Sequence, residues 1–222
     1  MDKGLDRAAN VVVIAIAVAF GWTQLRGGST LGRVTPSAAP ISIETAETDG
    51  SPAAKVGVIE YSDFECPFCI AFSRDTLPRI RQAFVATGSV VLAFVPFPLA
   101  SIHPNALLAA ESAECAGAQR KFWPMHDLEF RQPAALDQPH LRADAAELGL
   151  NEQAFVDCLG AGRVASEILA GIEQGRAAGV SSTPTFLIGP VVAAGRVKVR
   201  TVLTGARPFE EFEKAIRDSL GH

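Results

Sequence analysis

The sequence predicts an α/β domain that follows a hydrophobic N-terminal segment and a linker. Short apolar runs typical of buried strands alternate with longer amphipathic stretches typical of helices. Hydrophobic residues make up 48% of the 222 residues and charged residues 20%, which excludes a mainly disordered chain. The net charge of −4 argues against a basic nucleic-acid-binding surface, so we expect no nucleic-acid partner.

Residues 1–25 are predicted to be a membrane anchor or a signal segment. Val11–Phe20 is uninterruptedly apolar, and the whole run falls between the ~20 residues of a spanning helix and the ~7–15 of a signal-peptide core. Lys3 and Arg7 precede it and Arg26 and Arg33 follow it, so the basic residues do not fix its orientation. We favour a single-pass inner-membrane anchor with the domain in the periplasm. A cleaved signal that releases the domain into the periplasm, and a buried core helix, are the alternatives.

Residues 26–54 are predicted to be a flexible linker, because they are rich in Gly, Ser, Thr, Pro and Ala and contain no aromatic residue. The globular domain is expected over residues 55–220, with a helical insertion at about 104–160. No additional dimerisation domain is visible, so we expect a monomer.

The domain begins with a strand over Val56–Tyr61, followed by a loop and a helix that starts at Pro67, a preferred first helical residue. Pro78 is expected to kink this helix. The later elements are a strand over Ser89–Val95, helices over Asn105–Ala118, Lys121–Arg131, Gln138–Leu148, Glu152–Leu159 and Arg163–Ala178, a strand over Thr185–Ile188, a strand over Arg196–Arg200 and a helix over Pro208–Leu220.

Three details of these elements are predicted from spacing. Val164, Ile168 and Ile172 lie four residues apart and should share one buried helix face. Gly189-Pro190 should turn the chain after the strand that precedes it. Arg196–Arg200 alternates basic and apolar residues, as in a sheet-edge strand whose charged face discourages aggregation.

Cys66-Pro67-Phe68-Cys69 is the strongest functional signal. It follows a predicted strand and opens a helix, so Cys66 becomes the N-cap residue and both sulfur atoms fall within one turn. Unpaired N–H groups and the helix dipole at that position favour a thiolate and lower the pKa of Cys66. We expect Cys66, at the exposed end, to be the nucleophile, and the buried Cys69 to resolve the mixed disulfide.

A Cys-x-x-Cys pair is also half of a zinc site. His103 and His126 could complete such a site, but their spacing is irregular and no second cysteine pair follows. His103 is better explained as part of a helix start, and His126 as a packed residue among aromatic side chains. We therefore expect neither a metal nor an organic cofactor.

Glu60 lies six residues before Cys66 on the predicted strand. Burial beneath the cysteine pair would raise the pKa of its carboxyl and allow it to move the Cys69 proton; a strand-end or salt-bridged glutamate is the alternative. Pro184 directly precedes an apolar strand, and a cis bond there would turn the Thr183 backbone toward a substrate peptide.

Phe64 and Phe68 flank Cys66 and could form an apolar lip for unfolded substrates, with ordinary packing as the alternative. Thr183, Phe68 and Pro67 are the candidate substrate-contacting residues.

The segments Glu60–Cys69 and Gly179–Gly189 resemble the two active-site segments of DsbA-like thiol–disulfide oxidoreductases, and Ile102–Ala106 and Lys121–Asp127 resemble parts of that family's helical insertion. The resemblance covers about residues 55–220. It implies a bacterial, extracytoplasmic protein whose thioredoxin fold carries an inserted helical domain. It also supports Cys66 as attacking and Cys69 as resolving cysteine, and implies a cis-proline at Pro184 and a buried acid at Glu60.

One residue departs from that family. Its strongest oxidases carry a histidine between the two cysteines, where this chain has Phe68. A neutral ring cannot stabilise a thiolate as an imidazolium can. We therefore expect a milder oxidant.

Cys115 and Cys158 are predicted to form a structural disulfide, since disulfides persist outside the cytoplasm. Two separately buried free thiols are the alternative.

Taken together, these features predict an extracytoplasmic disulfide oxidase. Its partners would be protein substrates that carry thiols or disulfides, and a membrane redox partner that reoxidises the Cys66–Cys69 pair. A reductase or isomerase uses the same residues in the other direction. A non-catalytic chaperone or binding protein on the same scaffold is an alternative of a different class.

Overall fold

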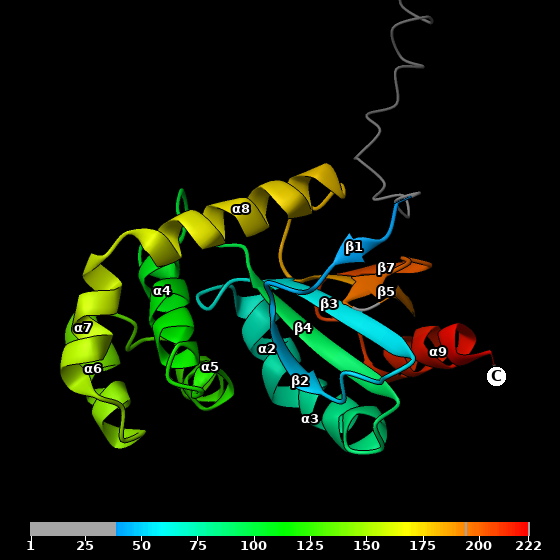
Figure 1. The fold of residues 1–222 in the computed structure, drawn as a ribbon, viewed down its shortest axis with the longest axis horizontal. Helices are drawn as coiled ribbons and strands as arrows, with labels where there is room; N and C mark the ends of the chain where they lie inside the picture. Colours follow the sequence, from blue (N-terminus) through cyan, green and yellow to red (C-terminus); the bar gives the residue numbers. More distant parts are fainter. Residues whose placement is uncertain (1–38, 194, 222) are drawn as a thin grey trace, which may run out of the picture. The chain divides into compact units, whose positions relative to one another are not determined.

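The computed structural model describes residues 39–193 and 195–221, which form one sheet covered by helices on both faces (Figure 1). The sheet has the strand order β1-β6-β5-β3-β4-β2, and β7 pairs with β5. Its strands are β1 Ile41–Ser42, β2 Glu47–Gly50, β3 Val56–Ser62, β4 Val90–Pro96, β5 Thr185–Ala193, β6 Arg196–Val197 and β7 Thr201–Thr204. The helices are α2 Pro67–Asp75, α3 Leu77–Ile80, the π-helical turn η1 Arg81–Val85, α4 Ala106–Gly117, α5 Phe122–Arg131, α6 Gln138–Glu147, α7 Glu152–Gly160, α8 Arg163–Ala177 and α9 Phe209–Leu220.

The strand β3 is the centre of the sheet. It pairs in parallel with β4 and antiparallel with β5, and all seven of its residues are buried. Its apolar, β-branched sequence suits a strand with helices on both sides. Helices α2 and α3 and the turn η1 make the crossover from β3 to β4, and the helix is interrupted next to Pro78, as this proline predicts.

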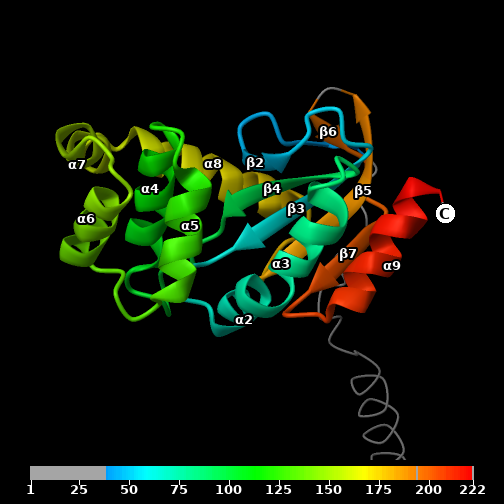
Figure 2. The ribbon, with the colours of Figure 1, turned by 90° about the horizontal axis from the view of Figure 1, so that it is seen from below.

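Two separate sets of helices cover the sheet (Figure 2). On one face, Phe72 of α2 and Phe212 of α9 pack on Phe186 of β5, with ring centroids 4.4 to 5.3 Å apart. On the other face, α8 buries its predicted apolar stripe of Val164, Ile168 and Ile172. Strand β3 lies between these two clusters, and α2 belongs to the first of them.

The two glycines of α8 have a packing role that the sequence does not reveal. A Cβ atom on Gly175 would lie 2.6 Å from the ring of Tyr61, and one on Gly171 would lie 2.9 Å from the side chain of Val95. The helix therefore approaches β3 and β4 more closely than any larger residue would allow. Gln174 then accepts a hydrogen bond of 3.1 Å from the Tyr61 hydroxyl.

The predicted helical insertion is present as α4 to α7, which lie together beyond the ends of β3 and β4 (Figure 1). Cys115 of α4 and Cys158 of α7 form a disulfide across 43 residues of sequence, the pairing that the sequence predicts.

The predicted linker over residues 26–54 is too long. Strand β2 pairs antiparallel with β4, from Glu47 opposite Phe94 to Gly50 opposite Val91, and β1 pairs with β6. The Thr48 carbonyl also accepts a hydrogen bond of 2.8 Å from the Trp123 indole. Both strands are short, and their sequences have little strand propensity. They are extended because they pair with the edges of the sheet.

The predicted turn at Gly189-Pro190 is also wrong, because β5 runs through it to Ala193. The Pro190 carbonyl accepts a hydrogen bond of 2.9 Å from the Lys198 N–H. A Cβ atom on Gly189 would lie 1.9 Å from the Lys198 carbonyl oxygen. The glycine thus marks a close approach of two backbones, rather than a turn.

The alternating segment 196–200 keeps its predicted faces but not its predicted position. Val197 and Val199 are buried, whereas Arg196, Lys198 and Arg200 are exposed. Only Arg196–Val197 is a strand, and β1 pairs outside it, so this segment is not the sheet edge. Strand β7, which follows at once, was not predicted.

The apolar segment within residues 1–25 lies outside the described residues. Within residues 39–193 and 195–221, no helix combines the length and the apolar character that a membrane crossing requires.

We expect the Cys115–Cys158 disulfide to contribute up to about 4 kcal/mol to the free energy of unfolding, because it closes a long loop in the unfolded chain. The double variant Cys115→Ala/Cys158→Ala should therefore unfold at lower urea concentration than the parent. An unchanged midpoint would contradict this, and Cys66→Ala/Cys69→Ala serves as the control for loss of two sulfur atoms.

Candidate active site

The cysteine pair lies where β3 gives way to α2, as predicted. Cys66 is the N-cap of α2 with φ −70° and ψ 121°, and Pro67 occupies the first helical turn. The Cys66 carbonyl accepts the N–H of Ile70 at 3.0 Å, so the helix is formed from its first residue. Cys66 and Cys69 are both free thiols in this structure.

The segment Thr183-Pro184 lies against the first cysteine. Strand β5 is antiparallel to β3, with Thr185 opposite Tyr61, so the residues before β5 reach the end of β3 from which α2 begins. The Thr183–Pro184 peptide bond is cis, and the Thr183 carbonyl oxygen lies 3.5 Å from the Cys66 sulfur. The Pro184 carbonyl accepts a 2.8 Å hydrogen bond from the Gly205 N–H, which fixes the segment to the end of β7.

Several groups stabilise the Cys66 thiolate. The hydrogen bond from the Cys69 thiol is the largest contribution to the pKa of Cys66 and lowers it, whereas burial raises it. Hydrogen bonds from Thr183 and from the N–H groups of Cys69 and Phe68 lower this pKa further. Together they lower the pKa of Cys66 to about 5. Cys66 is therefore ionised at neutral pH, as its position at a helix N-terminus predicts.

Cys66 is more enclosed than the sequence suggests. It exposes 5% of its surface and Cys69 exposes none. Cys66 is more exposed than Cys69, as predicted, but the Thr183 segment beside it leaves only a small part of Cys66 accessible.

Burial raises the pKa of Cys69 well above its ordinary value, and the hydrogen bond and charge of Cys66 raise it further, while Ser62 and the Asp63 backbone act in the opposite direction. The two sulfur atoms are thus in opposite protonation states. Such a pair combines a ready nucleophile with a thiol that keeps its proton.

Glu60 is buried on the face of β3 that α2 covers. Side chains alternate along a strand, so Val58, Glu60 and Ser62 share this face, and Val58 packs in the same cluster as Phe72 of α2. Burial raises the pKa of Glu60 to about 7, against smaller opposing contributions from Ser62 and Arg81. Ser62, two residues after Glu60 on this face, lowers the pKa of both the Glu60 carboxyl and the Cys69 thiol.

The two phenylalanines that flank Cys66 have different surroundings. Phe64 is buried against Phe94 and Phe130, with ring centroids 5.4 and 4.7 Å away, and is a core residue rather than part of a lip. Phe68 exposes 62% of its surface beside the exposed Pro67. Ile102, which exposes 68%, was not anticipated as a surface residue near the site.

Two acidic residues of the loop before Cys66 organise the site, and the sequence analysis did not single them out. The Asp63 carboxylate accepts hydrogen bonds from the Leu99 N–H at 2.7 Å and the Glu65 N–H at 2.9 Å, and it contacts His103 Nδ1 at 2.8 Å. The Glu65 carboxylate accepts the Asn105 N–H at 2.6 Å. The signal that points to them is a pair of acids beside the cysteines together with a His-Pro-Asn segment before a helix.

The two histidines of the zinc alternative have separate surroundings. His126 is fully buried among the rings of Phe94, Trp123 and Phe130, 4.8 to 4.9 Å away, and contacts Asp127 through Nδ1. It is the packed histidine that the sequence suggested, whereas His103 contacts the active-site loop. In the part of the chain that the structure describes, no three or more His, Cys, Asp or Glu residues form a group suited to a metal ion.

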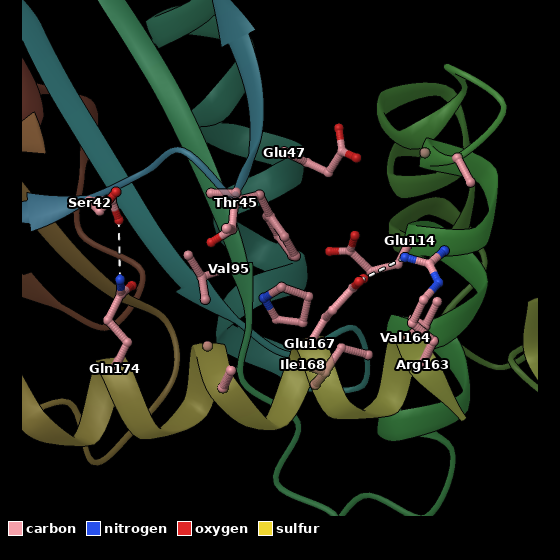
Figure 3. Close-up of a pocket in the computed structure, with 17 residues that line it drawn as sticks. Ser42, Thr45, Glu47, Val95, Glu114, Arg163, Val164, Glu167, Ile168 and Gln174 are labelled. Carbon is pink, nitrogen blue, oxygen red and sulfur yellow. Dashed lines mark hydrogen bonds and ion pairs between the residues drawn. The ribbon is translucent and has the colours of Figure 1, made fainter. Parts of the chain in front are cut away.

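A separate cavity of about 500 Å³ lies between the β1–β2 segment, α4 and α8 (Figure 3). Glu47, Glu114 and Glu167 line it, and burial together with the two neighbouring carboxylates raises the pKa of Glu114 to about 8. Arg163 forms an ion pair of 2.7 Å with Glu167. Neither Cys66 nor Cys69 lines this cavity, so it is not part of the cysteine site.

The chain resembles several known proteins. It is 35% identical over 149 residues to a Na⁺/H⁺ antiporter NhaA 3 of Salinispora tropica, a match that covers 67% of this chain and 22% of that protein. The chain therefore spans about a fifth of that relative's length. Its fold matches α-DsbA1 of Wolbachia pipientis with a TM-score of 0.70 at 23% identity, covering 82% of this chain and 94% of that one. It also matches oxidised BdbD of Bacillus subtilis with a TM-score of 0.71 at 21% identity, covering 84% and 99%.

A sequence model described as thioredoxin matches residues 43–218, which include both cysteines, the Thr183–Pro184 segment and the helical insertion. Because this match covers most of the chain, the protein belongs to the thioredoxin family, and its fold is that of the DsbA-like thiol–disulfide oxidoreductases.

Proposed function

We propose that the protein oxidises thiols of extracytoplasmic proteins through the Cys66–Cys69 pair. The observation that carries this proposal is the opposite protonation of the two sulfur atoms at the start of α2, with the pKa of Cys66 lowered to about 5 and that of Cys69 raised. A stabilised thiolate favours the reduced form of the pair, which makes its disulfide an oxidant.

The reaction begins with the disulfide form of the pair. A substrate thiolate attacks the Cys66 sulfur, a substrate–Cys66 bond forms, and Cys69 leaves as a thiolate that takes up a proton. A second substrate thiolate then attacks the substrate sulfur of this mixed disulfide, and Cys66 leaves as a thiolate. The substrate loses two electrons and gains a disulfide, while the pair gains the same two electrons. A disulfide-bearing membrane protein is the proposed partner that accepts them afterwards.

Glu60 is proposed to supply and accept the Cys69 proton. Its pKa of about 7 lets it do either near neutral pH, and the proton would pass by way of the Ser62 hydroxyl, which acts on the pKa of both groups. A buried thiol that must gain and lose a proton away from water needs such a neighbour.

Substrate contacts are proposed for the residues around the opening at Cys66. The Thr183 backbone, whose carbonyl lies 3.5 Å from the Cys66 sulfur, would pair with an extended peptide. Pro184 shapes this segment, and the exposed Pro67 and Phe68 offer apolar surface to an unfolded chain.

A periplasmic location, with the apolar segment as an inner-membrane anchor or a cleaved signal, is part of the proposal. The Cys115–Cys158 disulfide supports it, because such bonds persist in oxidising compartments. We propose a monomer as the working state.

We expect Cys69→Ala to accumulate mixed disulfides, because its Cys66 thiolate attacks disulfides of oxidised substrates or of the membrane partner and releases one thiol, and no Cys69 thiol is present to displace the captured protein. Non-reducing gels of acid-quenched cells, followed by identification of the captured proteins, would measure this. Cys66→Ala and Cys66→Ala/Cys69→Ala are the controls and should capture nothing. Equal capture by Cys66→Ala would refute Cys66 as the nucleophile. A biological role that Cys66→Ala leaves intact would instead support a non-catalytic binding protein.

The direction of electron flow is tested by the state of the pair in cells. An oxidase should keep Cys66–Cys69 mostly as a disulfide, which alkylation of acid-quenched cells would detect as protection of both residues. Mostly free thiols would favour a reductase or isomerase. Equilibrium with glutathione should give a potential less oxidising than the roughly −120 mV of the strongest oxidases, since Phe68 is uncharged.

We expect Glu60→Gln to slow disulfide exchange by tenfold or more and to remove a rate inflection near pH 7. It should also change stability with pH. The folded-state pKa of Glu60 is raised to about 7 from 4.5, so folding stability is full below pH 4.5 and falls as the pH rises through 7. The fall is up to about 3 kcal/mol, and Glu60→Gln should abolish it.

Urea unfolding at acidic and basic pH measures the stability effect, with Glu173→Gln at an exposed helix position as the matched control. An unchanged rate profile and unchanged pH dependence would exclude this role for Glu60.

A further inference from the structure

Neither residue between the two cysteines can carry a charge, yet a histidine from outside the pair lies next to the loop that ends at Cys66. We propose that His103, held by Asp63, is a positioning residue whose imidazolium charge stabilises the Cys66 thiolate. This inference rests on the proposed function, in which the thiolate is the reactive species.

His103 contacts the side chain of Asp63, and the backbone of Asp63 is hydrogen-bonded to that of Cys66. His103 Nδ1 lies 2.8 Å from Asp63 Oδ2, and the Asp63 carbonyl accepts the Cys66 N–H at 3.1 Å. The Asp63 side chain is fully buried and that of His103 is 17% exposed. The Leu99 N–H, at 2.7 Å from the same carboxylate oxygen, fixes the backbone four residues before His103. The ring is therefore held in one place by groups that belong to the active-site loop.

The acidic residues around this turn favour a cation beside them. Asp63 and Glu65, three residues and one residue before Cys66, are both acidic, and carboxylates beside a thiol oppose its ionisation. The groups that act on His103 are Asp63 and Glu65 of this loop and Cys66 at the start of α2. A protonated His103 offsets the carboxylates at the place where the thiolate forms.

The attraction between His103 and Cys66 is mutual. Partial burial lowers the pKa of His103, but the hydrogen bond and charge of Asp63, together with the charges of Cys66 and Glu65, outweigh it and raise this pKa. Two interacting groups shift each other's titration by the same free energy. The charge of His103 therefore favours the Cys66 thiolate as much as the thiolate favours the imidazolium.

The test separates this charge from a purely structural link. His103→Asn retains a donor at the Nδ1 position for Asp63 and removes the charge. With the Cys66–Cys69 pair reduced in the full chain, thiolate absorbance should show the pKa of Cys66 rising by about one unit. The equilibrium constant with glutathione should fall up to tenfold, which corresponds to about 30 mV toward a weaker oxidant. His103→Lys should restore much of both.

His140 provides a matched control, because it makes the same kind of contact with Asp137 on α6, at 2.6 Å. His140→Asn should leave the titration of Cys66 unchanged. A Cys66 titration in folded His103→Asn that superimposes on the parent would overturn the proposal, and so would an equal shift in His140→Asn.

A second measurement needs no variant. Nuclear magnetic resonance titration of His103 in the parent chain should give a higher pKa in the reduced than in the disulfide form, because only the former has a thiolate. Equal values would also overturn the proposal. Neither titration uses a substrate, so failed disulfide exchange with intact coupling would refute the proposed function alone, and missing coupling with normal exchange would refute this inference alone.

Discussion

The antiparallel pairing of β3 with β5 is the constraint on which the cysteine site depends. Strand β3 ends where α2 begins, and β5 starts beside that end, with Thr185 opposite Tyr61. Cys66 and the Thr183 carbonyl, 117 residues apart in sequence, therefore lie 3.5 Å from each other. The helices on both faces of the sheet hold this junction, since α2 and α9 pack on β5 while α8 packs on β3 through glycine contacts.

The pKa values of the two cysteines shift in opposite directions because their surroundings differ, although both lie within one turn of helix. Cys66 caps the helix and accepts hydrogen bonds, which lower its pKa, and Cys69 lies in the low-dielectric interior, where burial raises its pKa. The same interior raises the pKa of Glu60. Hydrogen bonds thus make Cys66 reactive, while burial keeps the proton on Cys69 and lets Glu60 hold one near neutral pH.

The helical insertion is connected to the active site through the segment that precedes it. The segment that leads into it, residues 97–105, is fastened to the loop before Cys66 by the carboxylates of Asp63 and Glu65. This brings His103 beside the site and leaves Ile102 exposed near it. The insertion and the thioredoxin core therefore meet at the active site, and the Cys115–Cys158 disulfide joins two of the helices into which that segment leads.

The sequence alone determined the features that depend on local chemistry. A strand, a helix-capping cysteine and a following proline predict the position and protonation of Cys66, and the apolar periodicity of 163–178 predicts its helix and buried face. The sequence also indicated Glu60 as a buried acid, and the oxidising compartment implied by the N-terminal segment favoured a disulfide between the two remaining cysteines. Only the tertiary structure decided which distant segments meet: β1 and β2 become strands because a sheet edge accepts them, Gly189 marks a close backbone approach, and Phe64 is core while Phe68 is exposed. The pairing of His103 with Asp63 belongs to the same class, because a hydrogen bond across 40 residues has no local pattern in the chain.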